Sequence, residues 1–227
     1  MTNTPFPYSA APDDLRLSDE LGLTAEQESE LRPGLWEILV ANGVEIEVEE
    51  LKEEYLIDLS WDVDETLVTR AWEELLAARR AQQAAWPAEI RETALTRAFA
   101  ELADIGVVAR QDFSCCGTCV NAEIGDERDD SRSWRGYIAF HHQDAERIPE
   151  DRETYINYGV FVDAYYTDKQ WKALKRKGQE KTYLGLVLEL MRGEVIPLLE
   201  RHGITVTWND SHNQRILLSN VDWYAAV

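Results

Sequence analysis

The first third of the chain has apolar residues at the spacing of amphipathic helices. Thr24 and Gln27 form a capping-box pattern, which predicts the start of a helix. The pair Pro33-Gly34 predicts that this helix is interrupted and that a second short helix follows. A further apolar stripe at helical spacing predicts a helix over residues 66–86, which ends before Pro87.

From Val107 onwards, alternating and β-branched runs replace the helical stripe, after one more expected helix over residues 90–105. Five short strands are predicted, over residues 107–113, 136–141, 154–162, 204–208 and 215–219. Helices are expected at 167–177 and 182–202, with a kink or restart at Pro197. Because neighbouring runs follow one another closely, the sequence predicts an α+β fold with a mostly antiparallel sheet and helices packed on one face.

The chain therefore divides into three predicted regions. Residues 1–23 contain three prolines and no sustained apolar period, which is typical of a flexible tail. Residues 24–86 form an acidic, mainly helical region, and residues 87–227 form the α+β domain. No repeat of fixed period is visible.

Charge is distributed unevenly between these regions. The net charge is -20 over 227 residues, and residues 1–90 contribute -15 of it, with 21 acidic and 6 basic side chains. Such a surface repels phosphate backbones, so nucleic acid is an unlikely partner of this half. It also attracts basic proteins over long range, although acidic surfaces commonly serve solubility alone.

The densest acidic run spans residues 45–65 and is the expected partner-binding surface. Its ten acidic residues are Glu45, Glu47, Glu49, Glu50, Glu53, Glu54, Asp58, Asp62, Asp64 and Glu65. The one basic cluster lies between Lys169 and Lys181, and we expect a solvated helix face there rather than a phosphate site. No apolar run is long enough to cross a membrane, and the N-terminus lacks the pattern of a secretory signal, which favours a cytoplasmic protein with reduced thiols.

Reactive side chains gather between Phe113 and Asp144. The segment holds all three cysteines, Cys115, Cys116 and Cys119, and ends in the pair His141 and His142. Zinc prefers four tetrahedral nitrogen and sulfur ligands, so Cys115, Cys116, Cys119 and His142 form a candidate zinc site. On a strand the two histidines would point to opposite faces, and only one of them could reach the metal.

Other interpretations of this cluster stay open at the sequence level. Ser114 could cap a short helix that lowers the pKa of a thiol, which would suit redox chemistry or a nucleophile. Small buried cysteines without any reactivity are also common, and His142 could then belong to a structural hydrogen-bond network with Asp144. Cysteine, histidine and carboxylate residues are too frequent for their presence alone to indicate a protease triad.

A series of short motifs resembles an uncharacterised bacterial domain family of unknown function. The motifs are Phe113 to Cys119, Gly136 to Asp144, Tyr158-Gly159, Val206 to Asn209, Arg215-Ile216 and Asp222-Trp223. The resemblance covers about residues 86–223 and departs from the family at Val120, where members usually have glycine. It implies a bacterial cytoplasmic protein with one compact domain, and it supplies no activity.

Two functional hypotheses follow. The first is a non-enzymatic binding protein, similar to an immunity protein, whose acidic surface neutralises or regulates a basic protein partner. The second is a zinc- or thiol-dependent protein, and so a candidate enzyme, that uses the Cys/His cluster. The first is favoured because no nucleotide-binding, zincin or serine-hydrolase motif occurs in the chain.

Overall fold

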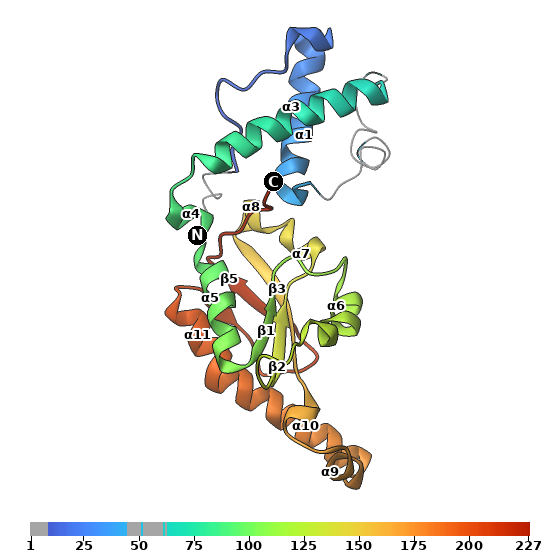
Figure 1. Cartoon of the computed structure of the whole chain (residues 1–227), viewed down its shortest axis with the longest axis vertical. Helices are drawn as coiled ribbons and strands as arrows, with labels where there is room; N and C mark the ends of the chain where they lie inside the picture. Colours follow the sequence, from blue (N-terminus) through green and yellow to red (C-terminus); the bar gives the residue numbers. More distant parts are fainter. Residues whose placement is uncertain (1–8, 45–50, 52–60, 62) are drawn as a thin grey trace. The chain divides into compact units, whose positions relative to one another are not determined.

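The computed structural model describes residues 9–44, 51, 61 and 63–227 (Figure 1). The chain forms two compact units. Unit 1 comprises residues 1–91 together with the C-terminal residues 224–227, and unit 2 comprises residues 92–223. Within the described residues, no helix combines the length and the apolar character that crossing a membrane requires.

Unit 1 is built on two long helices, α1 (Ala25–Asn42) and α3 (Glu65–Ala84), with a 3-10 turn at Asp19–Leu21 and the short α4 (Ala88–Arg91). The capping box at Thr24 is confirmed, because Thr24 and Gln27 bond each other's backbone N–H groups. The expected break at Pro33 is wrong. Helix α1 runs through Pro33, although the proline cannot donate a backbone hydrogen bond. Leu31, Leu35 and Leu39 lie on either side of the proline and are buried in the same core, which keeps the helix continuous.

The hydrophobic core of unit 1 includes residues that lie outside α1 and α3 in the sequence. Leu17 and Leu21 are buried in this core, so part of the segment that precedes α1 packs against the helices. Arg79 of α3 is fully buried, and its guanidinium lies over the rings of Trp36 and Trp86 at 5.6 and 4.9 Å. Burial lowers the pKa of Arg79 to about 10.

Unit 2 is organised around a five-stranded sheet with the order β1-β2-β3-β5-β4. The strands are β1 (Val107–Arg110), β2 (Gly136–Ala139), β3 (Glu153–Val160), β4 (Thr205–Thr207) and β5 (Ile216–Ser219). All five predicted strands are present, and the predicted α+β class is confirmed. Three of the four strand pairs are antiparallel, and the remaining pair, β1 with β2, is parallel.

The helices of unit 2 that flank the sheet are α5 (Ala94–Leu102), α6 (Gly117–Glu123), α10 (Arg176–Leu190) and α11 (Ile196–Arg201). Leu190 of α10 lies against Gly136, and Phe99 of α5 lies against Phe140, so these helices cover one face. Tyr137, the residue after Gly136, points to the other face and bonds Asn121 of α6. Helix α6 therefore lies on the face opposite α5 and α10 (Figure 1).

Shorter elements complete unit 2. They are the helices α7 (His142–Ala145), α8 (Ile148–Asp151) and α9 (Asp168–Ala173), and 3-10 turns at Ala103–Ile105, Ile124–Glu127 and Val162–Ala164. The predicted restart at Pro197 is confirmed, because a π-helical turn over Met191–Val195 separates α10 from α11. Proline has no N–H to donate to the preceding turn, which makes the wider π turn favourable there.

Two glycines, Gly136 of β2 and Gly159 of β3, leave space for neighbouring groups that a side chain would occupy. A Cβ atom on Gly136 would lie 2.5 Å from the carbonyl oxygen of Gly159 and 2.5 Å from the side chain of Leu190. A Cβ atom on Gly159 would meet the ring of Tyr137 at 2.6 Å. The absence of a side chain at Gly159 therefore gives Tyr137 room on the face that carries α6.

Candidate functional site

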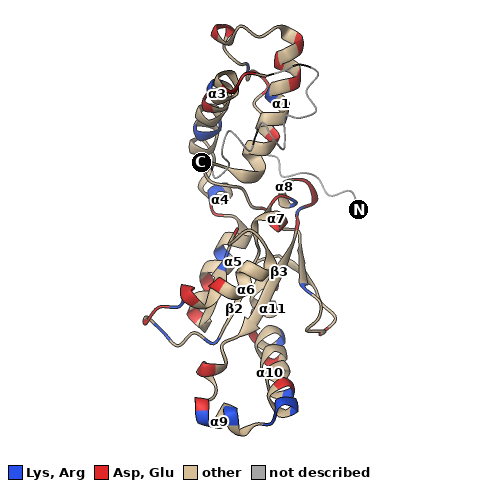
Figure 2. Cartoon of the chain, turned by 90° about the vertical axis from the view of Figure 1, so that its right-hand side faces the viewer, with Lys and Arg blue, Asp and Glu red and all other residues tan. Residues whose placement is uncertain are grey.

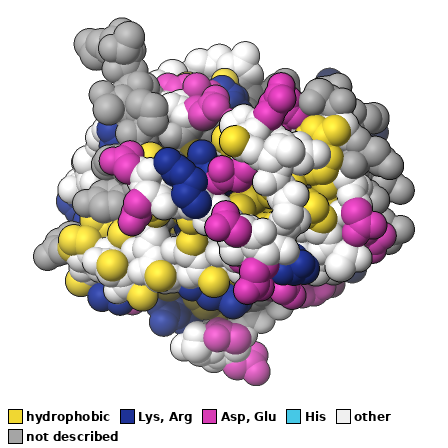
Figure 3. Space-filling view, turned by 90° about the horizontal axis from the view of Figure 1, so that it is seen from above, with side chains coloured by type: hydrophobic (Ala, Val, Ile, Leu, Met, Phe, Trp, Pro, Cys, Tyr) yellow, Lys and Arg dark blue, Asp and Glu magenta, His cyan; other side chains and the backbone are white. Residues whose placement is uncertain are grey.

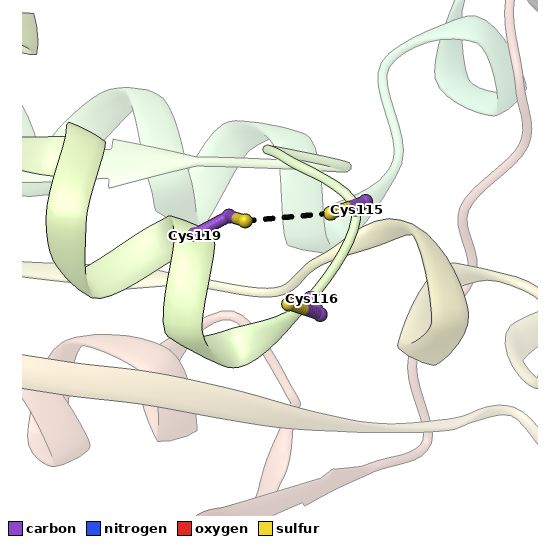
Figure 4. Close-up of side chains that lie close together, drawn as sticks. All are labelled: Cys115, Cys116 and Cys119. Atoms are coloured by element: carbon purple, nitrogen blue, oxygen red, sulfur yellow. Dashed lines mark hydrogen bonds between the residues drawn. The ribbon is translucent and has the colours of Figure 1, made fainter.

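The three cysteines meet where the loop after β1 enters α6. Their sulfur atoms all lie within 4.8 Å of one another, and Cys115 Sγ and Cys119 Sγ are 3.5 Å apart. Figure 4 shows Cys115 and Cys116 on the loop and Cys119 one turn into the helix. Cys115 is exposed and the other two are half-buried, so the group is open to solvent.

The backbone brings these thiols together through bonds to the end of β2. The N–H of Phe113 donates to the carbonyl of Phe140 at 3.0 Å, and the N–H of His142 donates to the carbonyl of Ser114 at 3.1 Å. Asp112 and Ser114 adopt positive φ angles, which turn the chain back towards α6. Val120 anchors the start of α6, because its side chain is fully buried.

The thiols of Cys116 and Cys119 have pKa values shifted in opposite directions. The backbone N–H groups of Cys119 and Thr118 lower the pKa of Cys116, which precedes the first turn of α6. Hydrogen bonds with the side chains of Cys115 and Cys116, together with repulsion between adjacent thiolates, raise the pKa of Cys119 to about 12. A cation between the sulfurs would remove this repulsion.

The two histidines lie in different positions from those predicted. Strand β2 ends at Ala139, so the expectation that both histidines lie on a strand is wrong. His142 begins α7, and its Nδ1 atom lies 3.0 Å from a carboxylate oxygen of Asp112. Among the described residues, the group of close metal ligands comprises the three cysteines, without His142.

A hydrogen-bond network with Asp144 was considered for His142, but it is His141 that interacts with Asp144. Its Nε2 atom lies 2.8 Å from Asp144, and both side chains are buried. Asp144 also pairs with the guanidinium of Arg215, from the start of β5. Arg215 belongs to the motif series, but its pairing with Asp144 was not predictable from a local pattern, because the two residues lie 71 positions apart in the sequence.

Ser114 does not cap α6, contrary to expectation. The helix begins at Gly117 with Cys116 as its N-cap residue, and no side chain caps it. The hydroxyl of Ser114 instead donates to the carboxylate of Glu123 at the other end of α6. The lowered pKa of Cys116 therefore comes from backbone N–H groups and neighbouring thiols.

Most of the expected partner-binding surface lies outside the described residues. Of its ten acidic residues only Asp64 and Glu65 are described, and Asp64 caps α3 by accepting from the backbone N–H groups of Thr66 and Leu67. On the face drawn in Figure 3, the described acidic side chains are interspersed with basic and hydrophobic ones. Binding of a basic partner through residues 45–65 stays a prediction.

The basic cluster lies on α9 and at the beginning of α10 (Figure 2). Lys169, Lys172, Lys175 and Lys177 are all exposed, and Lys172 forms a surface ion pair with Asp168. The exposure of these lysines agrees with a solvated helix face, and the role of the cluster stays a prediction.

Comparison with known proteins identifies the family. A family model described as a domain of unknown function, DUF6891, matches residues 25–225, so the chain belongs to this family. The match includes helix α1 and the acidic run, and so begins well before the start of the motif series at Phe113. Searches of the curated proteins and of the solved structures gave no match.

Proposed function

We propose that this member of the DUF6891 family binds a thiophilic metal ion, zinc in the first instance, through Cys115, Cys116 and Cys119. The observation that supports the proposal is the convergence of three sulfur atoms within 4.8 Å at a loop–helix junction. Zinc–sulfur bonds of about 2.3 Å in a tetrahedral site place two sulfurs roughly 3.8 Å apart. The thiols therefore need only small side-chain rotations to coordinate one ion.

Three protein ligands leave one tetrahedral position for another group. Cys115 is exposed, so solvent, a substrate atom or a side chain of a partner protein can approach that position. Zinc sites with three protein ligands and one exchangeable position are typical of catalytic centres, whereas structural sites are usually closed by four protein ligands. The cluster is thus suited to binding or polarising an incoming group.

The principal alternative is thiol chemistry without a metal. The lowered pKa of Cys116 favours it, since the thiolate is the nucleophile in disulfide exchange. Cys115 and Cys119, whose sulfurs are in contact, would then be the pair that forms a disulfide in the presence of a disulfide or peroxide oxidant. Metal binding and oxidation use the same sulfurs, so one sample can be tested for both.

The test is native mass spectrometry of protein purified without chelators and kept reduced. We expect the mass of one zinc ion, and its loss in Cys115→Ser and Cys119→Ser. Thr118→Ser is the matched control, because it changes the same loop without touching a thiol and should keep the metal. A zinc-free mass for the reduced wild type, after incubation with zinc, would exclude the proposal. A mass lower by two hydrogens after mild oxidation would then support the thiol alternative.

A further inference from the structure

Unit 2 contains a cavity beside the cysteine cluster, on the face of the sheet that carries α6. Its volume is about 590 Å³, which is enough for a small organic molecule. Thr118 of α6, Asn157 of β3 and His141 form part of its lining, and His212 and Arg215 contribute from the segment before β5. Gly117 and Thr118 of this lining lie between Cys116 and Cys119 in the sequence, so α6 and the residue before it carry both thiols and part of the cavity wall.

Two buried polar atoms of this lining have no hydrogen-bond partner. They are Nδ1 of His141 and Oδ1 of Asn157, and the two residues are only 5% and 8% exposed. Among the described residues of unit 2, these are the buried side-chain nitrogen and oxygen atoms without a partner, and both belong to one cavity. Folded proteins rarely leave such atoms unsatisfied, and exceptions commonly mark a functional site.

Both atoms are hydrogen-bond acceptors. Asp144 is paired with Arg215 and is therefore an ionised acceptor, so Nε2 of His141 carries the proton that bonds it at 2.8 Å. In a neutral imidazole, this leaves Nδ1 with a free lone pair. The amide nitrogen of Asn157 donates to the carbonyl of Gly117 at 3.0 Å, which fixes Oδ1 as the free end.

The lining also has no unbalanced charge that would select an ion. Arg215 donates to Asp144, so the carboxylate of Asp144 balances the positive charge of Arg215. No carboxylate lines the cavity among the described residues, which disfavours a cation. Aromatic rings provide flat surfaces instead, with His212 packed edge-on against Tyr158 and Tyr183 at centroid distances of 6.3 and 5.4 Å.

We infer that this cavity binds a neutral ring compound that presents hydrogen-bond donors, hydroxyl or ring N–H groups, to His141 and Asn157. Sugars and nucleobases share this chemistry, and both pack against aromatic rings. The inference concerns different residues from the proposed metal site and does not require it. A metal-free protein can therefore still bind such a compound, and a failure of one proposal leaves the other standing.

The experiment is saturation-transfer difference NMR on the full chain with two probe sets at millimolar concentration. One set contains glucose, galactose and ribose, and the other contains adenine, cytosine and uracil. We expect transfer to at least one probe, and the set that responds identifies the source of the donors. Asn157→Leu should lose at least tenfold in affinity for that probe, because it removes one acceptor.

A second variant keeps the test valid if Asn157→Leu does not fold. Thr118 is exposed at the cavity wall, so Thr118→Trp should fill the cavity without disturbing the core and abolish binding. Ala122→Trp is the matched control, since Ala122 is exposed on the same helix but does not line the cavity, and it should bind as the wild type does. The inference is wrong if no probe of either set shows transfer, or if transfer persists unchanged in Thr118→Trp.

Discussion

The glycine at the start of β2 makes a quantitative test of how the sheet supports the site. An alanine Cβ at Gly136 would lie 2.5 Å from both the Gly159 carbonyl oxygen and the Leu190 side chain. Leu190 can rotate, but the carbonyl belongs to the paired backbone of β3 and cannot move without separating the strands. Overpacking typically costs 1–3 kcal/mol, so we expect Gly136→Ala to lower the free energy of unfolding by about 3 kcal/mol.

Gly185 provides the matched control with the opposite sign. It lies inside α10, and a Cβ atom there would meet nothing within 4 Å. Alanine is favoured over glycine in a helix interior by about 1 kcal/mol, so Gly185→Ala should stabilise the protein by that amount. Urea unfolding followed by circular dichroism gives both values, and hydrogen exchange of the β2 and β3 amides assigns the effect to unit 2. A Gly136→Ala protein as stable as the wild type would refute the packing argument.

Three further results are expected. Zinc affinity should rise about tenfold per pH unit for each proton displaced, because Cys119, with a pKa of about 12, must lose its proton to bind the metal. Competition with a chromophoric chelator at several pH values measures this affinity. Burial lowers the pKa of His141, so the unfolded chain takes up a proton below about pH 6.5 that the folded chain excludes. Below that pH, the free energy of unfolding should therefore decrease as the pH decreases, by at most about 1.4 kcal/mol per pH unit from this group. In urea titrations at several pH values, His141→Phe should reduce this dependence of stability on pH. Arg79→Ala should cost about 2–4 kcal/mol in the same assay, since it empties the space between Trp36 and Trp86.

Local patterns in the sequence located the strands and the long helices of the fold. Alternation located all five strands, and the capping box at Thr24 located the start of α1, because both signals depend on neighbouring residues. The continuation of α1 through Pro33 was not predictable, since it depends on the burial of Leu35 and Leu39 in the tertiary core. The parallel pairing of β1 with β2 also depends on where α6 lies, which no local pattern specifies.

The candidate site shows the same division between local and long-range information. The cysteines are close in sequence, and their convergence needs only one loop and one helical turn, so the sequence could identify the group. The environment of the histidines depends on Asp112 and Arg215, which other parts of the chain bring into place. The role of Asn157 in the cavity could not be predicted from the sequence for a related reason. An asparagine in a strand gives no local sign that its partner is the carbonyl of Gly117, 40 residues away.

Helix α6 connects the two proposed sites, and this connection can be tested without knowing any organic ligand. Cys116 and Cys119 flank Gly117 and Thr118, and Gly117 is bonded through its carbonyl to Asn157 on β3. A metal ion that joins the sulfurs would restrict the first turn of α6 and hence this bond. Linkage requires that any such effect be reciprocal between the two sites.

We therefore expect zinc to slow hydrogen exchange in two separate segments. The first covers residues 113–124, which contain the ligands, and the second covers β3, which contains none of them. Hydrogen-exchange mass spectrometry with and without zinc measures both, and β4 serves as the internal control because β5 separates it from β3 in the sheet. Protection confined to residues 113–124 would show that the metal site and the cavity wall are uncoupled. Protection extending to β3 would show that metal binding at the thiols sets the rigidity of the wall against which the ring compound packs.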